Sequence, residues 1–315
     1  MKPQRAQPPG EAGGDRAGGG AGEPGTAEIL RAVRRVQLRT RRTVTDMVAG
    51  GFRSVFRGSG MEFEEVREYV PGDEVRAIDW NVTARMGHPY IKKFVEEREQ
   101  TVMLAVDASA SARLGSGARS VRQAAAELAA ILAFSAAGSG DRAGLLLFSD
   151  RVELELPPRG GNRQAFRITR EALYRESVSP HTSVALACDH LARVLKRRSY
   201  VFLLSDFLAP DFERPLGILA RRHDVVGLRL VDALHHALPA AGLLRWRDPE
   251  SGADLLVDSG SAAVRAALAE RAAARQAALR SSFGRHGVDL VDIPVGGGVV
   301  EPLVAYLHQR ERRLR

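Results

Sequence analysis

Three oxygen-bearing side chains follow a predicted buried strand at every second position. The run "TVMLAVDASAS" places Asp107, Ser109 and Ser111 directly after the apolar residues 102–106. Carboxylate and hydroxyl oxygens are hard ligands that suit Mg²⁺ or Mn²⁺ rather than Zn²⁺, and such a site leaves coordination positions for water or an incoming carboxylate. A turn after the strand would point all three side chains the same way. The spacing indicates a divalent-cation site, whereas each serine taken alone is more typical of a helix cap.

A second predicted buried strand also ends in an acid. The run "YVFLLSD" finishes at Ser205 and Asp206, and Thr182 stands between the two strands at the start of a predicted helix. In an open parallel sheet, ligands bind beyond the carboxyl ends of the strands, where the strand order reverses. We therefore predict one cation site made of five residues: Asp107, Ser109, Ser111, Thr182 and Asp206.

The elements that must position these residues alternate between strands and helices from residue 101 onward. Apolar runs predict strands at 102–106, 143–149, 152–157, 200–206, 224–231 and 288–294. Helical patterns cover 119–137, 163–174, 183–196, 212–222, 261–283 and 302–312. Strands separated by helices of this length predict an α/β fold, a mainly parallel doubly wound sheet covered on both faces. The pair 143–149 and 152–157 predicts a hairpin at the sheet edge, and a "DPESG" turn predicts a second hairpin at 243–258.

The composition divides the chain into three parts. Residues 1–27 are rich in glycine, proline and alanine, which predicts a disordered tail. Residues 28–100 are expected to form a helix followed by a β-rich segment, with strand-like runs at 62–70 and 89–97. Residues 101–315 are expected to form the α/β domain, with the 243–258 hairpin as an insertion.

The overall composition limits which cellular compartment and which kinds of partner we expect. Lysine and arginine number 46 against 38 acidic residues, and no stretch interleaves aromatic with basic residues as single-strand binders do. The single cysteine allows no intramolecular disulfide. No window approaches the about 18 apolar residues of a membrane helix, and the N-terminus lacks the apolar core of a signal peptide. We expect a cytoplasmic protein with a generic basic surface and no membrane span.

Two further functional classes stay open beside a binding module. Acids at strand ends are compatible with a Mg²⁺-dependent phosphatase or nuclease. The sequence has neither a P-loop glycine motif nor an Asp-x-Asp pair that would supply a nucleophile with its acid. A nucleic-acid-binding protein is the other alternative, and it rests on the net charge of +8 alone.

The motif "DASAS", the later Thr182 and the later Asp206 resemble the metal-ion-dependent adhesion site of von Willebrand factor type A domains. In that family, Asp-x-Ser-x-Ser, a distant threonine and a later aspartate hold a divalent cation, and a carboxylate from a partner protein completes its shell. The resemblance implies a non-enzymatic protein-interaction module that uses Mg²⁺ or Mn²⁺.

The segment "GMEFEEVREYVPGDEVRAIDWNVTARMG" is similar to the signature of the bacterial family known as domain of unknown function 58. That family pairs such a segment with a type A-like domain and is commonly encoded beside AAA+ ATPases of the MoxR type. The resemblance therefore implies an adaptor or partner of a MoxR-type ATPase, in protein maturation or complex assembly.

The signature residues themselves allow two interpretations. The set comprises Arg67, Tyr69, Asp73, Arg76, Asp79, Trp80 and Arg85. We favour a buried ion-pair and hydrogen-bond network that docks the segment on the sheet, since arginine–carboxylate pairs often fix loops. The alternative is a recognition surface near the metal, anchored by Trp80.

Overall fold

The computed structural model describes residues 61–96, 99–117 and 119–314. The predicted disordered tail at 1–27 and the helix expected after it lie outside the described residues.

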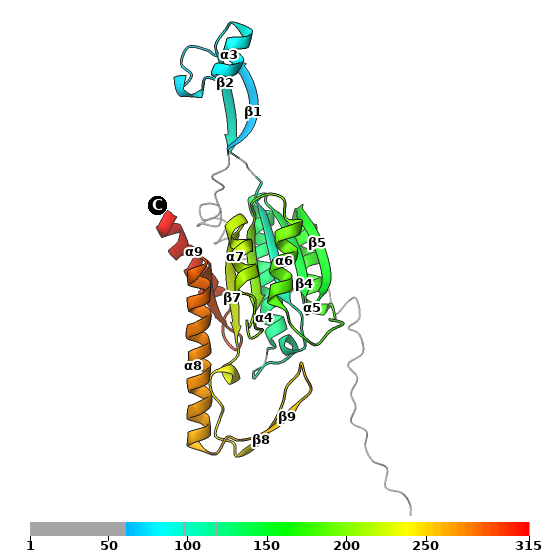
Figure 1. The fold of residues 1–315 in the computed structure, drawn as a ribbon. Coiled ribbons are helices and arrows are strands. Elements are labelled where there is room, and N and C mark those ends of the chain that lie inside the picture. The colour runs from blue at the N-terminus through cyan, green and yellow to red at the C-terminus, as the bar shows by residue number, and fades with distance from the viewer. Residues whose placement is uncertain (1–60, 97–98, 118, 315) are drawn as a thin grey trace, which may run out of the picture.

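A six-stranded sheet forms the centre of the described α/β domain (Figure 1). In sheet order its strands are β10 (Asp289–Pro294), β7 (Asp224–Val231), β6 (Tyr200–Ser205), β3 (Thr101–Asp107), β4 (Arg142–Phe148) and β5 (Val152–Gly160). All neighbouring pairs are parallel except β4–β5, an antiparallel hairpin at one edge. The predicted mainly parallel α/β sheet with an edge hairpin is confirmed.

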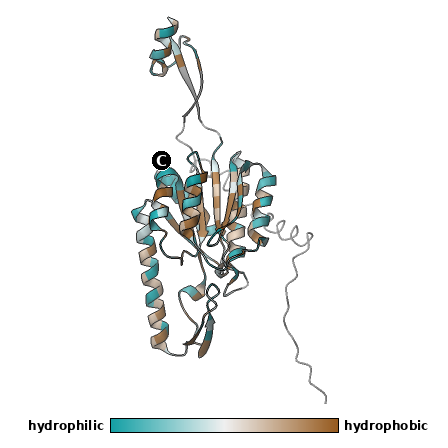
Figure 2. Ribbon diagram, turned by 45° about the vertical axis from the view of Figure 1, so that its right-hand side comes forward, coloured by the Kyte–Doolittle hydropathy of each residue, from teal (hydrophilic) through white to brown (hydrophobic). Residues whose placement is uncertain are grey.

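Helices cover both faces of this sheet. One apolar cluster joins the sheet to α4 (Val121–Ser139), α5 (Asn162–Tyr174) and α9 (Val300–Leu314). A second cluster, on the other face, joins it to α6 (Val184–Val194), α7 (Glu213–Arg222) and α8 (Ala262–Arg285). Strand β3 serves both, because side chains alternate along a strand: Leu104 lies in the first cluster and Met103 in the second. Figure 2 shows the largely hydrophobic strands of the sheet between helices that carry both hydrophilic and hydrophobic residues.

The central helix α4 begins where the chain supplies a complete cap. The Ser120 hydroxyl accepts a hydrogen bond from the Gln123 amide, and the Gln123 side chain accepts one from the Ser120 amide. This reciprocal pair satisfies two amides that the first turn leaves without partners. The helix then runs through alanine and leucine, nearly all of it buried, against the sheet.

Helix α8 extends past the sheet, and a small hairpin directly precedes it in the chain. Strands β8 (Leu243–Arg247) and β9 (Asp254–Asp258) pair as a separate two-stranded sheet, as the "DPESG" turn predicted. Figure 1 shows this hairpin and the first half of α8 beyond the carboxyl ends of the large sheet. The last turn of α8 is anchored by Phe283, which packs so closely on Gly227 that a Cβ there would lie 2.4 Å from the ring.

The N-terminal signature forms a small unit of its own. Strands β1 (Met61–Glu68) and β2 (Tyr90–Glu96) pair antiparallel, and α3 (Trp80–Met86) lies between them in sequence. We predicted the two strands but not the short helix. It begins because the Asp79 carboxylate accepts hydrogen bonds from the Asn81 and Val82 amides, and it ends at Gly87 with a φ of 75°.

Within the described part of the chain, the signature residues are only partly buried, and the contacts seen among them lie inside the unit rather than on the large sheet. Arg67 makes a bidentate pair with Asp73, at 2.8 and 2.7 Å, which closes a turn within the unit itself. Asp79 caps helix α3, and the Tyr69 amide donates a hydrogen bond to the carbonyl of Pro89. Three members are exposed, with Trp80 67% exposed: Arg76, Trp80 and Arg85. The expected burial is wrong for these three exposed residues, whereas the expected arginine–carboxylate pairing is present between Arg67 and Asp73, which lie six residues apart.

The unit joins the large sheet at the amino end of β3, whereas Asp107 stands at the carboxyl end of that strand. Trp80 belongs to this unit at the amino end of β3, so it does not lie beside the predicted metal ligands at the carboxyl end, as the recognition-surface alternative expected. The exposed side chains of the unit stay available for contacts elsewhere.

Candidate functional site

Two acids stand side by side where the strand order reverses. From β3 the chain proceeds outward through β4 and β5, and then returns to β6 on the other side of β3. Strands β3 and β6 are parallel neighbours, with Val106 opposite Leu204. Asp107 ends β3 and Asp206 follows β6, so both lie at the switch point that the sequence predicted.

The Asp107 carboxylate is buried, with 4% of its surface exposed. Its Oδ1 accepts a hydrogen bond from the Ser109 amide at 3.0 Å, and its Oδ2 accepts one from the Ser205 hydroxyl at 2.8 Å. Burial, and then the negative charge of Asp206, raise the pKa of Asp107 to about 7 in spite of these bonds. A buried carboxylate with a second acid close by is stabilised in its charged form by a nearby positive charge.

The two motif serines point the same way, as the spacing predicted. The hydroxyls of Ser109 and Ser111 are 3.0 Å apart, in a turn that leads into a short 3₁₀ helix, Ser111–Arg113. Ser109 is buried, whereas Ser111 lines an open cavity. This arrangement presents hydroxyl oxygens next to the buried acid.

Asp206 faces the same cavity from a strained turn. Burial and the negative charge of Glu250 raise its pKa, against a hydrogen bond from the Leu208 amide to its Oδ1 at 3.0 Å. The next residue, Phe207, has a φ of 55°, which is uncommon for a residue other than glycine. The ring of Phe207 packs on Phe283 with centroids 5.1 Å apart, and this contact holds the turn.

Thr182 comes to the site on a loop tied to the serine motif. The Ala110 amide donates to the carbonyl of Pro180 at 3.0 Å, and the Ser183 amide donates to the carbonyl of Ser149 at 3.0 Å. The Thr182 hydroxyl donates to Glu250 Oε1 at 2.8 Å. Glu250 belongs to the turn of the β8–β9 hairpin, and sequence reasoning assigned that turn no role in the site.

The structure brings the five predicted residues to one end of the sheet. Ser111, Thr182 and Asp206 line a cavity of about 480 Å³, together with Glu250, and Asp107 and Ser109 lie buried beside them. Apolar side chains, among them Leu208 and Trp246, complete the wall. The cavity therefore joins an acidic, hydroxyl-rich floor to an apolar rim.

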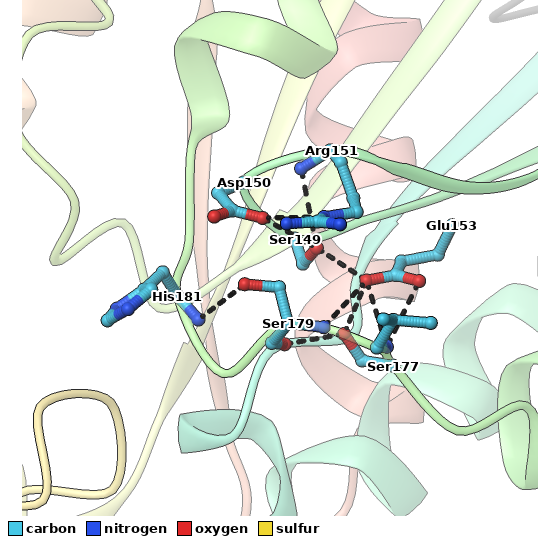
Figure 3. A network of polar contacts seen from close by, with 8 residues as sticks. Ser149, Asp150, Arg151, Glu153, Ser177, Ser179 and His181 are labelled. Atoms are coloured by element: carbon cyan, nitrogen blue, oxygen red, sulfur yellow. Dashed lines mark hydrogen bonds and ion pairs between the residues drawn. The ribbon is translucent and has the colours of Figure 1, made fainter.

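A network around Glu153 holds the loop that carries Thr182 (Figure 3). The carboxylate accepts hydrogen bonds from the hydroxyls of Ser149 and Ser177, at 2.6 and 2.7 Å, and from the amides of Val178 and Ser179. Partial burial opposes the charged form, but these donors outweigh it and lower the pKa of Glu153 to about 2. Sequence reasoning missed this residue, because it stands in an ordinary strand pattern and its partners come from a distant loop.

Glu153→Gln is expected to loosen the 177–182 loop in a pH-dependent way. Every partner of the Glu153 carboxylate is a hydrogen-bond donor. The glutamine side chain replaces one of the two acceptor oxygens by an NH₂ group, which is itself a donor and cannot accept from them. Since the folded pKa lies below the ordinary value of 4.5, the stabilisation is complete above that value and is lost as the pH falls toward 2. We expect a loss of about 1 to 2 kcal/mol at pH 7, allowing for solvent screening, that shrinks as the pH falls below 4.5 and vanishes only below about pH 2. Urea unfolding across this range checks it, and an equal loss at every pH would contradict it.

Comparison with known proteins decides the family. The model of a family described as "Protein of unknown function DUF58" matches residues 65–278. This chain belongs to the DUF58 family. The uncharacterized protein Rv1480 of Mycobacterium tuberculosis is 30% identical to it over 290 residues, 90% of each chain. The uncharacterized protein MAV169 of Mycobacterium avium is 28% identical over 162 residues, which cover 50% of this chain and 94% of that one.

Several solved structures are similar to this DUF58 chain. An aerotolerance-related membrane protein from Bacteroides fragilis is 16% identical, with 68% of this chain and 99% of that one covered and a TM-score of 0.41. BatB, a conserved hypothetical protein from Bacteroides thetaiotaomicron, is 14% identical, with the same coverage and a TM-score of 0.42. The VWA domain of SpRpn10 is 12% identical, with 66% and 95% covered and a TM-score of 0.35. Among the described residues of the DUF58 chain, no helix is long and apolar enough to cross a membrane.

The donor set of the DUF58 chain fits a hard divalent cation. In the described part of the chain, no group of three or more His, Cys, Asp or Glu is arranged to hold a metal. A cation here would rest on Asp107 and Asp206 and on the neighbouring serine and threonine hydroxyls. Such oxygens match Mg²⁺ or Mn²⁺, and a cation would offset both the burial of Asp107 and the negative charge of the neighbouring Asp206, which together raise the pKa of Asp107.

Proposed function

We propose that this DUF58 chain is a non-enzymatic protein-interaction module that binds an acidic side chain of a partner through Mg²⁺ or Mn²⁺. The observation that carries the proposal is the buried carboxylate of Asp107 next to the half-buried, cavity-lining carboxylate of Asp206, beside aligned hydroxyls at the switch point of the sheet. The cation supplies a positive charge that a partner's carboxylate can complete.

Each residue of the predicted site would have a distinct role in this binding. Asp107 and Asp206 would neutralise the cation, and Ser109, Ser111 and Thr182 would hold it with hydroxyl oxygens. Ser205 orients Asp107 through the 2.8 Å hydrogen bond, so that the other carboxylate oxygen stays with the Ser109 amide. The floor is fixed before any partner arrives, which lowers the entropy lost on binding.

The contacts of the hydroxyls favour binding over catalysis. A nucleophilic serine needs a base within hydrogen-bond reach. The Ser109 hydroxyl lies 3.0 Å from that of Ser111. The carboxylates that accept from Thr182 and Ser205 are Glu250 and Asp107, acids that face or hold the proposed cation position. These groups are arranged as ligands and positioning donors rather than as an activated nucleophile.

The family resemblance supplies the partner class, an AAA+ ATPase of the MoxR type. The chain would act as its adaptor in protein maturation or complex assembly. An acidic residue on the surface of the ATPase would be the group that reaches the cation.

A capture experiment with a purified MoxR-type ATPase tests the proposal. We expect the immobilised chain to retain the ATPase in Mg²⁺ and to release it in EDTA, and we expect Asp206→Asn to abolish retention. Asp211→Asn is the matched control, because it removes the same charge from an exposed residue of the same loop. Retention that ignores both EDTA and Asp206→Asn would refute a cation-mediated contact.

A further inference from the structure

The β8–β9 turn brings two carboxylates to the cavity, of which Asp248 is bonded within the turn itself and Glu250 is presented to Thr182. The Asp248 side chain accepts a hydrogen bond from the Glu250 amide at 3.0 Å, and the Asp248 carbonyl accepts one from the Gly252 amide at 2.8 Å. Gly252 has a φ of 72°, so the chain reverses directly after Glu250. An aspartate that bonds a backbone amide two residues later is a common way to fix a turn. The backbone that carries Glu250 is therefore defined before the side chain makes any contact.

The Glu250 carboxylate is also what joins the hairpin to the site. Among the described residues, the 2.8 Å bond from Thr182 to Glu250 is the hydrogen bond that connects residues 243–258 with the α/β domain. The rest of that contact is apolar, through the side of the hairpin that carries Trp246 and Val257 into the cavity. Leu256, on the outer side, is 67% exposed. A hairpin tethered in this way would leave the site at the cost of this hydrogen bond, the attraction between Asp248 and His181, and a limited apolar contact.

Glu250 stands where a partner's acid would be needed. It lines the cavity with Ser111, Thr182 and Asp206, and, unlike Asp248 of the same turn, it accepts a hydrogen bond from the site itself, from a threonine 68 residues earlier in the chain. Its charge is near enough to act on Asp206. A carboxylate supplied from outside the floor, through a movable segment, has the chemistry of the ligand that the proposed function requires.

We propose that Glu250 is a built-in competitor, which occupies the position of the partner's carboxylate until a partner displaces the β8–β9 hairpin. This inference rests on the proposed function, and it defines the partner's chemistry further. Because the displaced hairpin uncovers apolar wall beside the acidic floor, the matching partner presents a glutamate or aspartate next to a large apolar side chain. Glu250 competes at the high effective concentration of a group in the same chain, so the free protein is kept from weak acidic ligands.

Two measurements on the full chain test the proposal. The first is hydrogen–deuterium exchange of residues 243–258, and the second is Mn²⁺ binding, monitored by electron paramagnetic resonance. The proteins are the parent chain, Glu250→Gln, and the matched control Glu270→Gln, which removes the same charge from an exposed position on α8. We expect Mg²⁺ to slow exchange of the hairpin in the parent and in the control. In Glu250→Gln the hairpin should exchange about tenfold faster, the loss expected of a hydrogen bond to a charged group, while Mn²⁺ still binds.

The outcomes separate this inference from the proposed function. Equal exchange of residues 243–258 in the parent and in Glu250→Gln would overturn the inference. Loss of Mn²⁺ binding in Glu250→Gln would also overturn it, because Glu250 would then be a resident ligand rather than a competitor. If the parent itself binds no Mn²⁺ and Glu250→Gln still frees the hairpin, the cation function fails and the contact with Thr182 stands as the hairpin's latch.

Discussion

Asp107→Asn is expected to stabilise the cation-free chain and to abolish its response to Mg²⁺. Asparagine has the shape of aspartate, so its Oδ1 can still accept from the Ser109 amide, and the Ser205 hydroxyl can turn to accept from its Nδ2. What the substitution removes is a buried negative charge beside Asp206, whose burial is unfavourable without a cation. The same charge is needed to bind the cation. The substitution therefore raises the stability of the cation-free chain and removes the stabilisation by Mg²⁺.

The pH dependence gives the size and the sign of this effect. The pKa of Asp107 rises from an ordinary value of 3.8 to about 7 on folding. At about 1.4 kcal/mol per pH unit, this difference sets an upper limit of about 4 kcal/mol. Because the folded chain binds the proton more tightly, the cation-free parent loses stability as the pH rises from about 4 to above 7. Asp107→Asn should be more stable than the parent by about 2 to 4 kcal/mol at pH 8 and nearly equal to it at pH 4.

Urea unfolding in EDTA and in excess Mg²⁺ measures both halves of the prediction. Mg²⁺ at about 100 times its Kd should stabilise the parent by about 2.7 kcal/mol and leave Asp107→Asn unchanged. Asp232→Asn is an informative control, because Asp232 is also buried but hydrogen bonds from the Ser116 and Leu234 amides leave its pKa lowered despite burial. That variant should lose stability at neutral pH. A loss of stability in both variants would show that Asp107 is a structural acid.

The fold was readable from the sequence because burial dictates residue type along whole elements. Strand β6 is buried from Tyr200 to Ser205, and a run of apolar residues of that length between helices permits few other structures. The place of the site followed from the same pattern, since acids at the ends of two buried strands must meet if those strands are neighbours. Asp107 and Asp206 are thus predictable from periodicity and topology together.

The parts of the site that escaped prediction depend on side-chain reach across the fold. Glu153 and Glu250 stand 24 and 68 residues from the groups that they bind, Ser177 and Thr182, and no local pattern relates the two ends. The prediction for the signature segment was incorrect for a different reason. Its charged residues suggested long-range docking, but Arg67 found Asp73 within the same turn. Charge alone shows that a partner is needed, whereas the backbone decides which partner is within reach.

Phe283→Ala is expected to cost stability and cation affinity together. Phe283 is 1% exposed and packs edge-on against Phe207 and Phe212, with centroids 5.1 and 6.1 Å away. Removing a buried ring of this kind costs about 3 to 5 kcal/mol, because the surroundings fill the cavity only in part. Phe207 directly follows Asp206 and holds a φ of 55° that needs support from its neighbours. Without Phe283 the turn is free to relax, and Asp206 moves with it.

Leu128→Ala separates the local effect from the global one. Leu128 is equally buried, but it lies on α4 in the apolar cluster of the opposite sheet face. Its loss should cost about 2 to 5 kcal/mol and leave the affinity for Mn²⁺ unchanged in the folded chain. Phe283→Ala should weaken that affinity at least about tenfold under conditions where both variants are folded, as misplacing one charged ligand requires. If the two variants bind Mn²⁺ alike, the aromatic cluster serves stability only, and Asp206 is positioned by β6 and the Leu208 amide alone.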